Sequence, residues 1–114
     1  MHTLERWTTE AGERGVARLD IPPHATRERH FEIDVRFVVR PGAGEAPGFG
    51  LRVLFDGRQQ WARHLAIDHG GEDSLDWRAR VTVPVGEPLR IQAVGDVKQA
   101  LRCALCITAE EVER

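Results

Sequence analysis

The sequence has few cysteines, a single methionine and no tyrosine among its 114 residues. Two cysteines are too few for a secreted disulfide framework and are typical of a reducing compartment. No apolar run is long enough to cross a bilayer, and the first ten residues lack the basic start and apolar core of a signal peptide. We therefore expect a cytoplasmic location and no membrane partner.

An excess of charge of one sign is also missing. Lys and Arg number 16 and Asp and Glu number 18, which gives a formal net charge of -2 and argues against nucleic acid as a partner. The composition, 41% hydrophobic and 30% charged, is typical of a soluble globular protein. The length predicts one domain over residues 1–114. Lys98 is the only lysine, and we interpret the many Arg, Ala and Gly residues as coding bias in a GC-rich bacterial genome.

Alternation of apolar and polar residues is what the sequence does contain. In HFEIDVRFVVR, residues 30–40, the apolar residues alternate with charged or polar ones, which predicts a half-buried strand. The same period of two recurs over residues 75–83 and 89–93 and more weakly over 17–21. Turn-forming segments rich in Pro, Gly and Asp separate these runs, a spacing typical of a β-sandwich or barrel.

The segment FGLRVLFDGRQQWARHLAID, residues 49–68, contains two apolar runs around Asp56 and Gly57. A two-residue loop at this pair would set the apolar face of the first run against polar residues of the second. We therefore predict a three-residue turn with Gly57 in the left-handed conformation, which places Leu51 opposite Trp61. The Asp-Gly pair is interpreted as a turn and not as the tip of a ligand-binding loop.

The C-terminal residues 99–112 favour a helix by propensity, but their apolar residues alternate as in a strand. We favour a strand that pairs with the run 89–93, and a helix is the alternative. A C-x-x-C pair on a strand spans about 10 Å and points to opposite faces, which suits neither a disulfide nor a metal. The alternating inward residues are Leu101, Cys103, Leu105 and Ile107, and Cys106 points outward.

Other residues suited to chemistry lack the spacing of known motifs. The five histidines show no H-E-x-x-H pattern. The acidic segment DHGGEDSLD, residues 68–76, does not match the twelve-residue calcium loop, and we interpret it as a hydrated connection. Ser74, the only serine, lies there without a nucleophile motif. We predict no catalytic residues, no metal site and no cofactor, and hence no enzyme.

Arginines at outward strand positions are the main binding candidates. Several on one face would form a cationic patch for an anionic ligand or an acidic partner. Acidic residues on the same faces favour a simpler interpretation, cross-strand charge pairs. One aromatic residue and one outward histidine complete the set. The candidate binding residues are Arg36, Arg52, Arg78, Arg80, Trp7 and His64.

The phrases GLRVLFDGRQQWARHLAI and DWRARVTVPVGEPLRIQAVG, residues 50–67 and 76–95, resemble the central strands of galactose-binding-like jelly rolls and carbohydrate-binding modules. In those proteins a DG hairpin precedes a strand, and a V.VP.G..L.I.A run brings the chain back across the sandwich. The resemblance implies a jelly-roll fold and makes carbohydrate a candidate ligand. The sequence departs from the pattern because Trp61 and Trp77 fall on inward faces, whereas sugar sites need exposed aromatic rings. Only Trp7 is left as such a ring.

These patterns together predict a single antiparallel β-sandwich, jelly-roll-like, with seven to eight strands. Our functional hypothesis is a non-catalytic binding or assembly module for protein partners, including a second copy of itself. Outward apolar residues Val38, Leu54 and Val94 motivate it, because such residues grouped on one face mark contact surfaces. A carbohydrate-binding module and a metal-dependent enzyme are the alternatives. The predicted inward residues include Phe31, Ile33, Val35, Phe37, Leu51, Val53, Trp61, Trp77, Val81, Ile91, Leu101 and Leu105.

Overall fold

The computed structural model describes residues 3–113, which form eight strands and no helix. Accordingly, this part of the chain contains no helix that could span a membrane. The strands are β1 (Arg6–Glu10), β2 (Val16–Ile21), β3 (Arg29–Pro41), β4 (Gly48–Phe55), β5 (Arg58–Ala66), β6 (Asp73–Val83), β7 (Leu89–Lys98) and β8 (Ala100–Val112).

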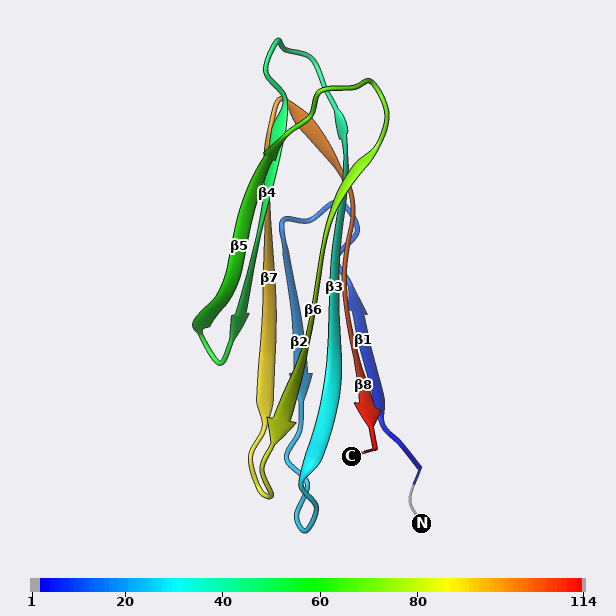
Figure 1. Ribbon diagram of the computed structural model, residues 1–114, viewed down its shortest axis with the longest axis vertical. Helices are drawn as coiled ribbons and strands as arrows, with labels where there is room; N and C mark the ends of the chain where they lie inside the picture. Colours follow the sequence, from blue (N-terminus) through cyan, green and yellow to red (C-terminus); the bar gives the residue numbers. More distant parts are fainter. Residues whose placement is uncertain (1–2, 114) are drawn as a thin grey trace.

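The strands form two antiparallel four-stranded sheets packed as a sandwich (Figure 1). Sheet A has the order β1-β8-β3-β6, and sheet B has the order β2-β7-β4-β5. Every strand therefore pairs with partners distant in sequence except in the β4–β5 hairpin, which is the arrangement of an eight-stranded jelly roll. The molecule is elongated, 54 × 24 × 20 Å, and the start of β1 lies at the same end as the end of β8 (Figure 1). The predicted sandwich of seven to eight strands is confirmed.

The core lies between the sheets and is built from the alternating apolar residues. On β3, one of the two inner strands of sheet A, Phe31, Ile33 and Phe37 are fully buried. Phe37 faces Gly95 on β7, where an added Cβ would lie 2.7 Å from the Phe37 ring. The absence of a side chain at Gly95 thus gives the ring its space, so the two sheets can pack closely at this point.

The turn between β4 and β5 differs from the prediction. Phe55 is the register partner of Arg58, so the loop has two residues, Asp56 and Gly57, with φ angles of 50° and 83°. Positive φ at both central residues is the signature of a type I′ turn, which suits the right-handed twist of paired strands. The three-residue turn was therefore wrong.

A β-bulge explains why the apolar faces still agree. The β4–β5 register shifts between Val53 and Leu54, where Gln60 is the extra residue of β5. This one-residue insertion restores the alternation that the two-residue turn would have inverted, so Trp61 lies opposite Val53 and not opposite Leu51. Trp61 packs against the core as predicted.

The C-terminal strand is confirmed, but its predicted partner was wrong. Strand β8 pairs with β1 and β3 in sheet A, whereas β7 pairs with β2 and β4 in sheet B. Between β7 and β8 stands Gln99, with φ of 51°, and its backbone carbonyl accepts a hydrogen bond from the amide of Gly42. The chain therefore changes sheet at this position and does not fold back as a hairpin.

A second bulge corrects the predicted faces at the start of β8. The β3–β8 register shifts between Val38 and Val39, opposite Cys103. The extra residue reverses the alternation before it, so Leu101 is 49% exposed and not in the core. Beyond the bulge the predicted pattern holds, and Leu105 is fully buried.

Candidate functional site

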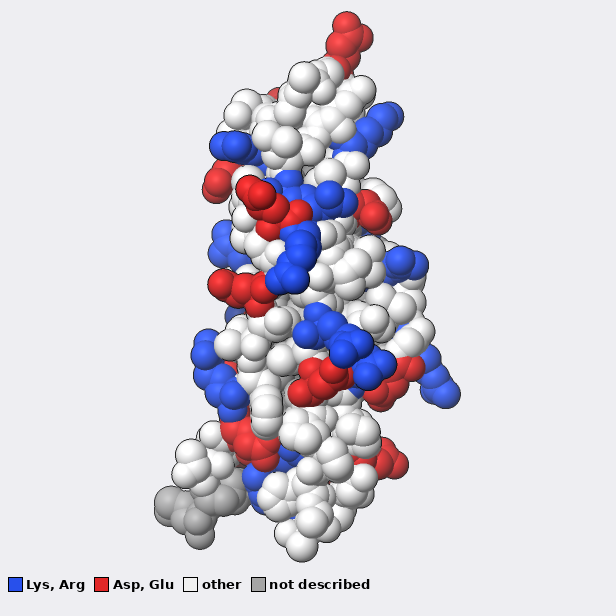
Figure 2. All heavy atoms as spheres, turned by 180° about the vertical axis from the view of Figure 1, so that it is seen from behind, with Lys and Arg blue, Asp and Glu red and all other residues white. Residues whose placement is uncertain are grey.

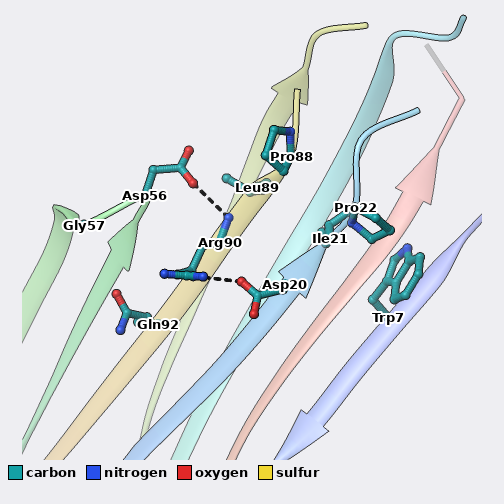
Figure 3. Close-up of a pocket in the computed structure, with 10 residues that line it drawn as sticks. All are labelled: Trp7, Asp20, Ile21, Pro22, Asp56, Gly57, Pro88, Leu89, Arg90 and Gln92. Carbon is teal, nitrogen blue, oxygen red and sulfur yellow. Dashed lines mark hydrogen bonds and ion pairs between the residues drawn. The ribbon is translucent and has the colours of Figure 1, made fainter. Parts of the chain in front are cut away.

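A groove of about 790 Å³ crosses the part of the sandwich where β2 ends and β7 begins (Figure 3). Trp7 of β1 lies at one end of this groove, and the β4–β5 turn lies at the other. Between these ends, apolar residues of β2, β7 and the adjoining loops alternate with polar ones. The lining comprises the apolar Ile21, Pro22, Pro88 and Leu89 and the polar Asp20, Asp56, Arg90 and Gln92, together with Trp7 and Gly57.

Arg90 organises the polar part of the groove. Its Nε donates a hydrogen bond to Asp20 Oδ1 at 2.8 Å, and its backbone amide donates to Asp56 Oδ1 at 2.9 Å (Figure 3). The amide of Asp56 in turn donates to the carbonyl of Arg90 at 2.8 Å. The hydrogen bond from Arg90 lowers the pKa of the Asp20 carboxyl, which is therefore ionised at neutral pH. Asp56 thus anchors the turn to β7 and also presents its carboxylate to the groove.

A partly buried group of charges holds the apolar end of the groove. We call Glu5, Arg27, Arg29 and Glu111 the end cluster. Glu5 accepts hydrogen bonds from Trp7 Nε1 at 3.0 Å, from Arg29 Nη1 at 2.8 Å and from Arg27 Nη2 at 2.9 Å. Arg27 also pairs with Glu111. Arg29, which is only 1% exposed, donates to the carbonyl of Pro22 at 2.7 Å. The cluster therefore fixes both Trp7 and Pro22.

The Glu5 carboxylate is the hub of this cluster. Burial raises the pKa of Glu5, but the hydrogen bonds from Trp7 and Arg29 and the charges of Arg29 and Arg27 outweigh burial and leave its pKa below the ordinary value. The ionised Glu5 balances two arginines, one of which, Arg29, is almost fully buried. The positions of Trp7 and Pro22 in the groove thus depend on the charge pairing of the end cluster.

The outer face of sheet A, which we call face A, carries three of the predicted binding residues. Arg36 and Asp76 lie opposite each other with Nε and Oδ1 3.7 Å apart. Arg78 donates to Asp34 at 2.8 Å, and Arg80 lies 3.6 Å from Glu32. These arginines therefore alternate with carboxylates and do not form a cationic patch. On the side of the molecule seen in Figure 2, acidic and basic side chains are likewise interspersed.

The outer face of sheet B, which we call face B, is different at its centre. One row across the sheet consists of Val16, Val94, Arg52 and Ala62, which are register partners in that order. Val16 is 53% exposed, and Leu54 lies half-buried in the next row. Within residues 3–113, Arg52 has no ion pair, in contrast to the arginines of face A.

Face B also holds His64, another predicted residue. Gly50 and His64 are register partners, and the ring of His64 covers Gly50 so closely that an added Cβ would lie 2.3 Å from it. Charges flank the row that contains Arg52 on both sides. Asp96, which is exposed, is the register partner of Gly50. Toward the groove, Asp20 pairs with Arg18 at 3.1 Å and with Arg90 at 2.8 Å. The row at the centre of face B is thus apolar except for Arg52.

The structure separates the residues that the sequence grouped. Of the predicted set, Arg36, Arg78 and Arg80 lie on face A, Arg52 and His64 lie on face B, and Trp7 lines the groove. The three apolar residues that suggested a contact surface are also divided, because Val38 lies on face A and the other two lie on face B. Strand order decides these placements, and no local pattern reports it.

The groove residue Asp20 was missed, and Arg90 was recognised only as one of several outward arginines. Each is an ordinary outward polar residue of a strand, and only the pairing of β2 with β7 brings them together. The sequence offered only a weak signal. Asp20 stands shortly before the proline-containing turn PPH, and Arg90 stands shortly after the proline-containing turn GEP.

The residues considered for metal binding lie in separate places. Cys103 and Cys106 are free thiols on β8, and burial raises the pKa of Cys106. His69 lies 3.6 Å from Asp73 in the acidic segment 68–76. Within residues 3–113, no three His, Cys, Asp or Glu side chains gather closely enough to hold a metal ion.

The sequence matches no protein-family model and no curated protein. Its fold is similar to parts of larger solved structures. Dimeric latent PorU from Porphyromonas gingivalis has a TM-score of 0.47 at 7% identity, with 95% of this chain and 13% of that chain covered. The mosquito-larvicidal Cry4Aa toxin from Bacillus thuringiensis has a TM-score of 0.48 at 10% identity, with 85% and 18% covered.

A third similar structure is that of infectious bursal disease virus Gx strain, with a TM-score of 0.46 at 9% identity. There, 92% of this chain and 33% of that chain are covered. The chain thus spans a third or less of the length of each of these proteins. At such identities the similarity concerns the two-sheet β-sandwich alone, and fold alone does not carry function.

Proposed function

We propose that the chain is a non-catalytic binding module that assembles with other proteins through the centre of face B. The observation that carries this proposal is Arg52, a cation without an ion pair set in a row of Val16, Val94 and Ala62. Apolar area surrounding an arginine is the composition found at the centre of protein interfaces, where Arg is enriched among the residues that dominate affinity.

The expected desolvation costs of the two faces also favour face B as the binding surface. Covering face A would remove water from carboxylates and arginines that are already paired, at a desolvation cost with little new attraction in return. Covering the middle of face B would bury Val16, Val94 and Leu54 and would leave one cation in need of an acceptor. A partner with an acidic side chain among apolar residues would supply that acceptor.

Site-specific photo-crosslinking in cells tests the proposal. A photoreactive amino acid at position 94 on face B is expected to give a discrete protein adduct. The same group at position 108, on face A, is the matched control and is expected to give none. Adding Arg52→Glu should abolish the adduct from position 94, whereas Arg80→Glu should not. Equal adducts from both faces, or no adduct from position 94, would contradict the proposal.

Carbohydrate is a second candidate ligand, and the groove is the observation that favours it. Trp7 lies at one end of the groove, and Asp20, Asp56 and Gln92 offer hydrogen-bonding groups along it. An aromatic ring beside such groups is a common way to hold a sugar. Titration with a panel of oligosaccharides, followed by tryptophan fluorescence, tests this candidate. A change that Gln92→Ala weakens supports it, and no change with any sugar class excludes it.

The remaining alternative, a metal-dependent enzyme, finds no support in the geometry of residues 3–113, where possible ligands lie apart. Elemental analysis of the purified protein tests it directly. Stoichiometric zinc or another transition metal would reopen that alternative.

A further inference from the structure

Strand β6 forms one edge of sheet A and differs from the other edge strands. Its 11 residues pair with β3 without a break in register, and within the described part of the chain its other side has no strand partner. The edge strands β1 and β2 have only 5 and 6 residues, and β5 contains the bulge at Gln60. β6 is therefore the longest regular edge of the fold.

Natural proteins protect such edges with charged side chains, above all lysine, and with proline, bulges or very short strands. Residues 73–83, DSLDWRARVTV, contain neither proline nor lysine, and their register shows no bulge. Apolar side chains also reach this edge, because Trp77 and Val81 are only half-buried and Trp77 stacks on Trp61 at 6.4 Å. The edge thus offers both free backbone groups and apolar area to an added strand.

We propose that β6 pairs antiparallel with β6 of a second copy of this chain, with Trp77 on the two-fold axis. The inference rests on the proposed assembly role and names one partner for it, at a surface other than face B. In an isologous dimer the two β6 strands are related by a two-fold axis. Because they run antiparallel, the residue numbers of any two facing residues add up to the same value, and this sum defines the register.

The charges of β6 select this register. Continuation of both sheet faces requires an even sum, since an odd sum would set inward against outward residues. A sum of 154 places Asp76 opposite Arg78 of the second copy, twice by symmetry. A sum of 152 would place Asp76 opposite Asp76, and a sum of 156 would place Arg78 opposite Arg78. Like charges directly opposite destabilise a sheet, so the register centred on Trp77 is preferred.

The selected register also continues the charge alternation already present on face A. Within one copy, Arg78 is bonded to Asp34 at 2.8 Å and Asp76 lies 3.7 Å from Arg36. Across the axis, the row reads Asp34, Arg78, then Asp76 and Arg36 of the second copy. Negative and positive side chains therefore alternate over the four central strands of the resulting eight-stranded sheet.

Sedimentation velocity of charge-reversal variants tests the inference. The wild type is expected to show a monomer–dimer equilibrium. Asp76→Arg sets two arginines opposite each other across the axis, and Arg78→Asp sets two aspartates opposite each other, so each variant alone should dimerise at least tenfold more weakly. Mixed together, the two variants pair opposite charges at both positions, and the heterodimer should form with an affinity near that of the wild type.

Asp34→Arg is the matched control. It opposes Arg78 within its own chain, much as Asp76→Arg opposes Arg36, but it lies one strand away from the edge and should leave dimerisation within about twofold of the wild type, which is a small free-energy difference. Circular dichroism verifies that each variant is folded. The heterodimer provides a result that no misfolding of a single variant can imitate.

Three outcomes would overturn the inference: a wild type that stays monomeric at high concentration, variants that dimerise as well as the wild type, or a mixture that does not recover the dimer. A different result would contradict the proposed function, namely the absence of a crosslinked adduct from position 94. A strict monomer that still forms this adduct would therefore reject β6 pairing and leave the binding role of face B in place.

Discussion

Face A and face B belong to sheets of four strands each, but they differ in how their charged side chains are paired. On face A, Arg78 lies within 3.7 Å of both Glu32 and Asp34, and Arg36 lies opposite Asp76. At the centre of face B, Arg52 has apolar register partners on both sides. One face thus satisfies its charges internally, and the other leaves a cation to be satisfied from outside.

The difference arises from strand order and not from composition. Both faces present arginines at outward positions of their strands. On face A, β6 brings its arginines beside the acidic residues of β3, whereas on face B, β4 places its arginine between β7 and β5, which contribute Val94 and Ala62 there. Strand order therefore leaves Arg52 without an ion pair, which is the reason that we propose face B as the binding surface.

The largest expected effect concerns the end cluster, where charge pairing is buried. Arg29→Ala removes a side chain that is 1% exposed and leaves Glu5 without one of its donors. Breaking a buried ionic group by removing one partner costs about 3–5 kcal/mol. Urea unfolding followed by tryptophan fluorescence measures the loss. A loss below about 1 kcal/mol, the range of an exposed pair, would show that the cluster behaves like face A.

A smaller effect is expected from Glu5→Gln at neutral pH, about 1.5–3 kcal/mol, the range for hydrogen bonds to charged groups. Because folding lowers the pKa of Glu5, its ionised form stabilises the fold above the ordinary pKa of a glutamate. This contribution is lost as the pH falls through the lowered pKa, so the wild type and the variant should converge in acid. Unfolding free energies at a series of pH values measure the convergence. A constant difference would exclude this linkage.

The exposed pairs of face A are expected to contribute less. A double-mutant cycle on Asp34 and Arg78 should give a coupling of about 0.2–1 kcal/mol that shrinks as salt is added. The matched substitution on face B, Arg52→Ala, should change stability by less than about 0.5 kcal/mol, because it breaks no pair. A destabilisation by Arg52→Ala larger than that from Arg78→Ala would contradict the contrast between the faces.

The smallest effect sharpens the description of face B. Gly50→Ala places a methyl group where the His64 ring lies, 2.3 Å from it. The ring belongs to a flexible, exposed side chain and can move away, so we expect a stability change within about 0.5 kcal/mol. Nuclear magnetic resonance shifts of the His64 ring should change while those of core methyl groups stay constant. Unchanged His64 shifts would mean that the ring does not cover Gly50 in solution.

Much of the fold was predictable because burial imposes a period of two on every strand. The alternation over β3 alone identified a strand whose inward residues are buried. The errors lie at two bulges, opposite Cys103 and at Gln60, because one inserted residue reverses the faces and depends on the partner strand. Leu101 was placed in the core for this reason. The turn at Gly57 was predicted with three residues because the extra residue was expected in the turn, whereas it is Gln60 in β5.

The candidate site was less predictable, since it consists of residues from strands that are distant in the sequence. Arg52 was identified as a candidate, but its lack of an ion pair depends on the neighbours that β7 and β5 supply. Asp20 and Arg90 face each other only because β2 pairs with β7. Charge pattern along one strand cannot report which strand lies beside it.

The most direct test of the central claim is hydroxyl-radical footprinting of the chain alone and in its crosslinked complex. The method reports which side chains lose contact with water when the partner is bound. We expect oxidation of Val16, Leu54 and Val94 on face B to fall, while Val38 on face A stays as reactive as in the free chain. Protection of Val38 with no change at the three face B residues would contradict the claim that the partner binds where the fold leaves its cation unpaired.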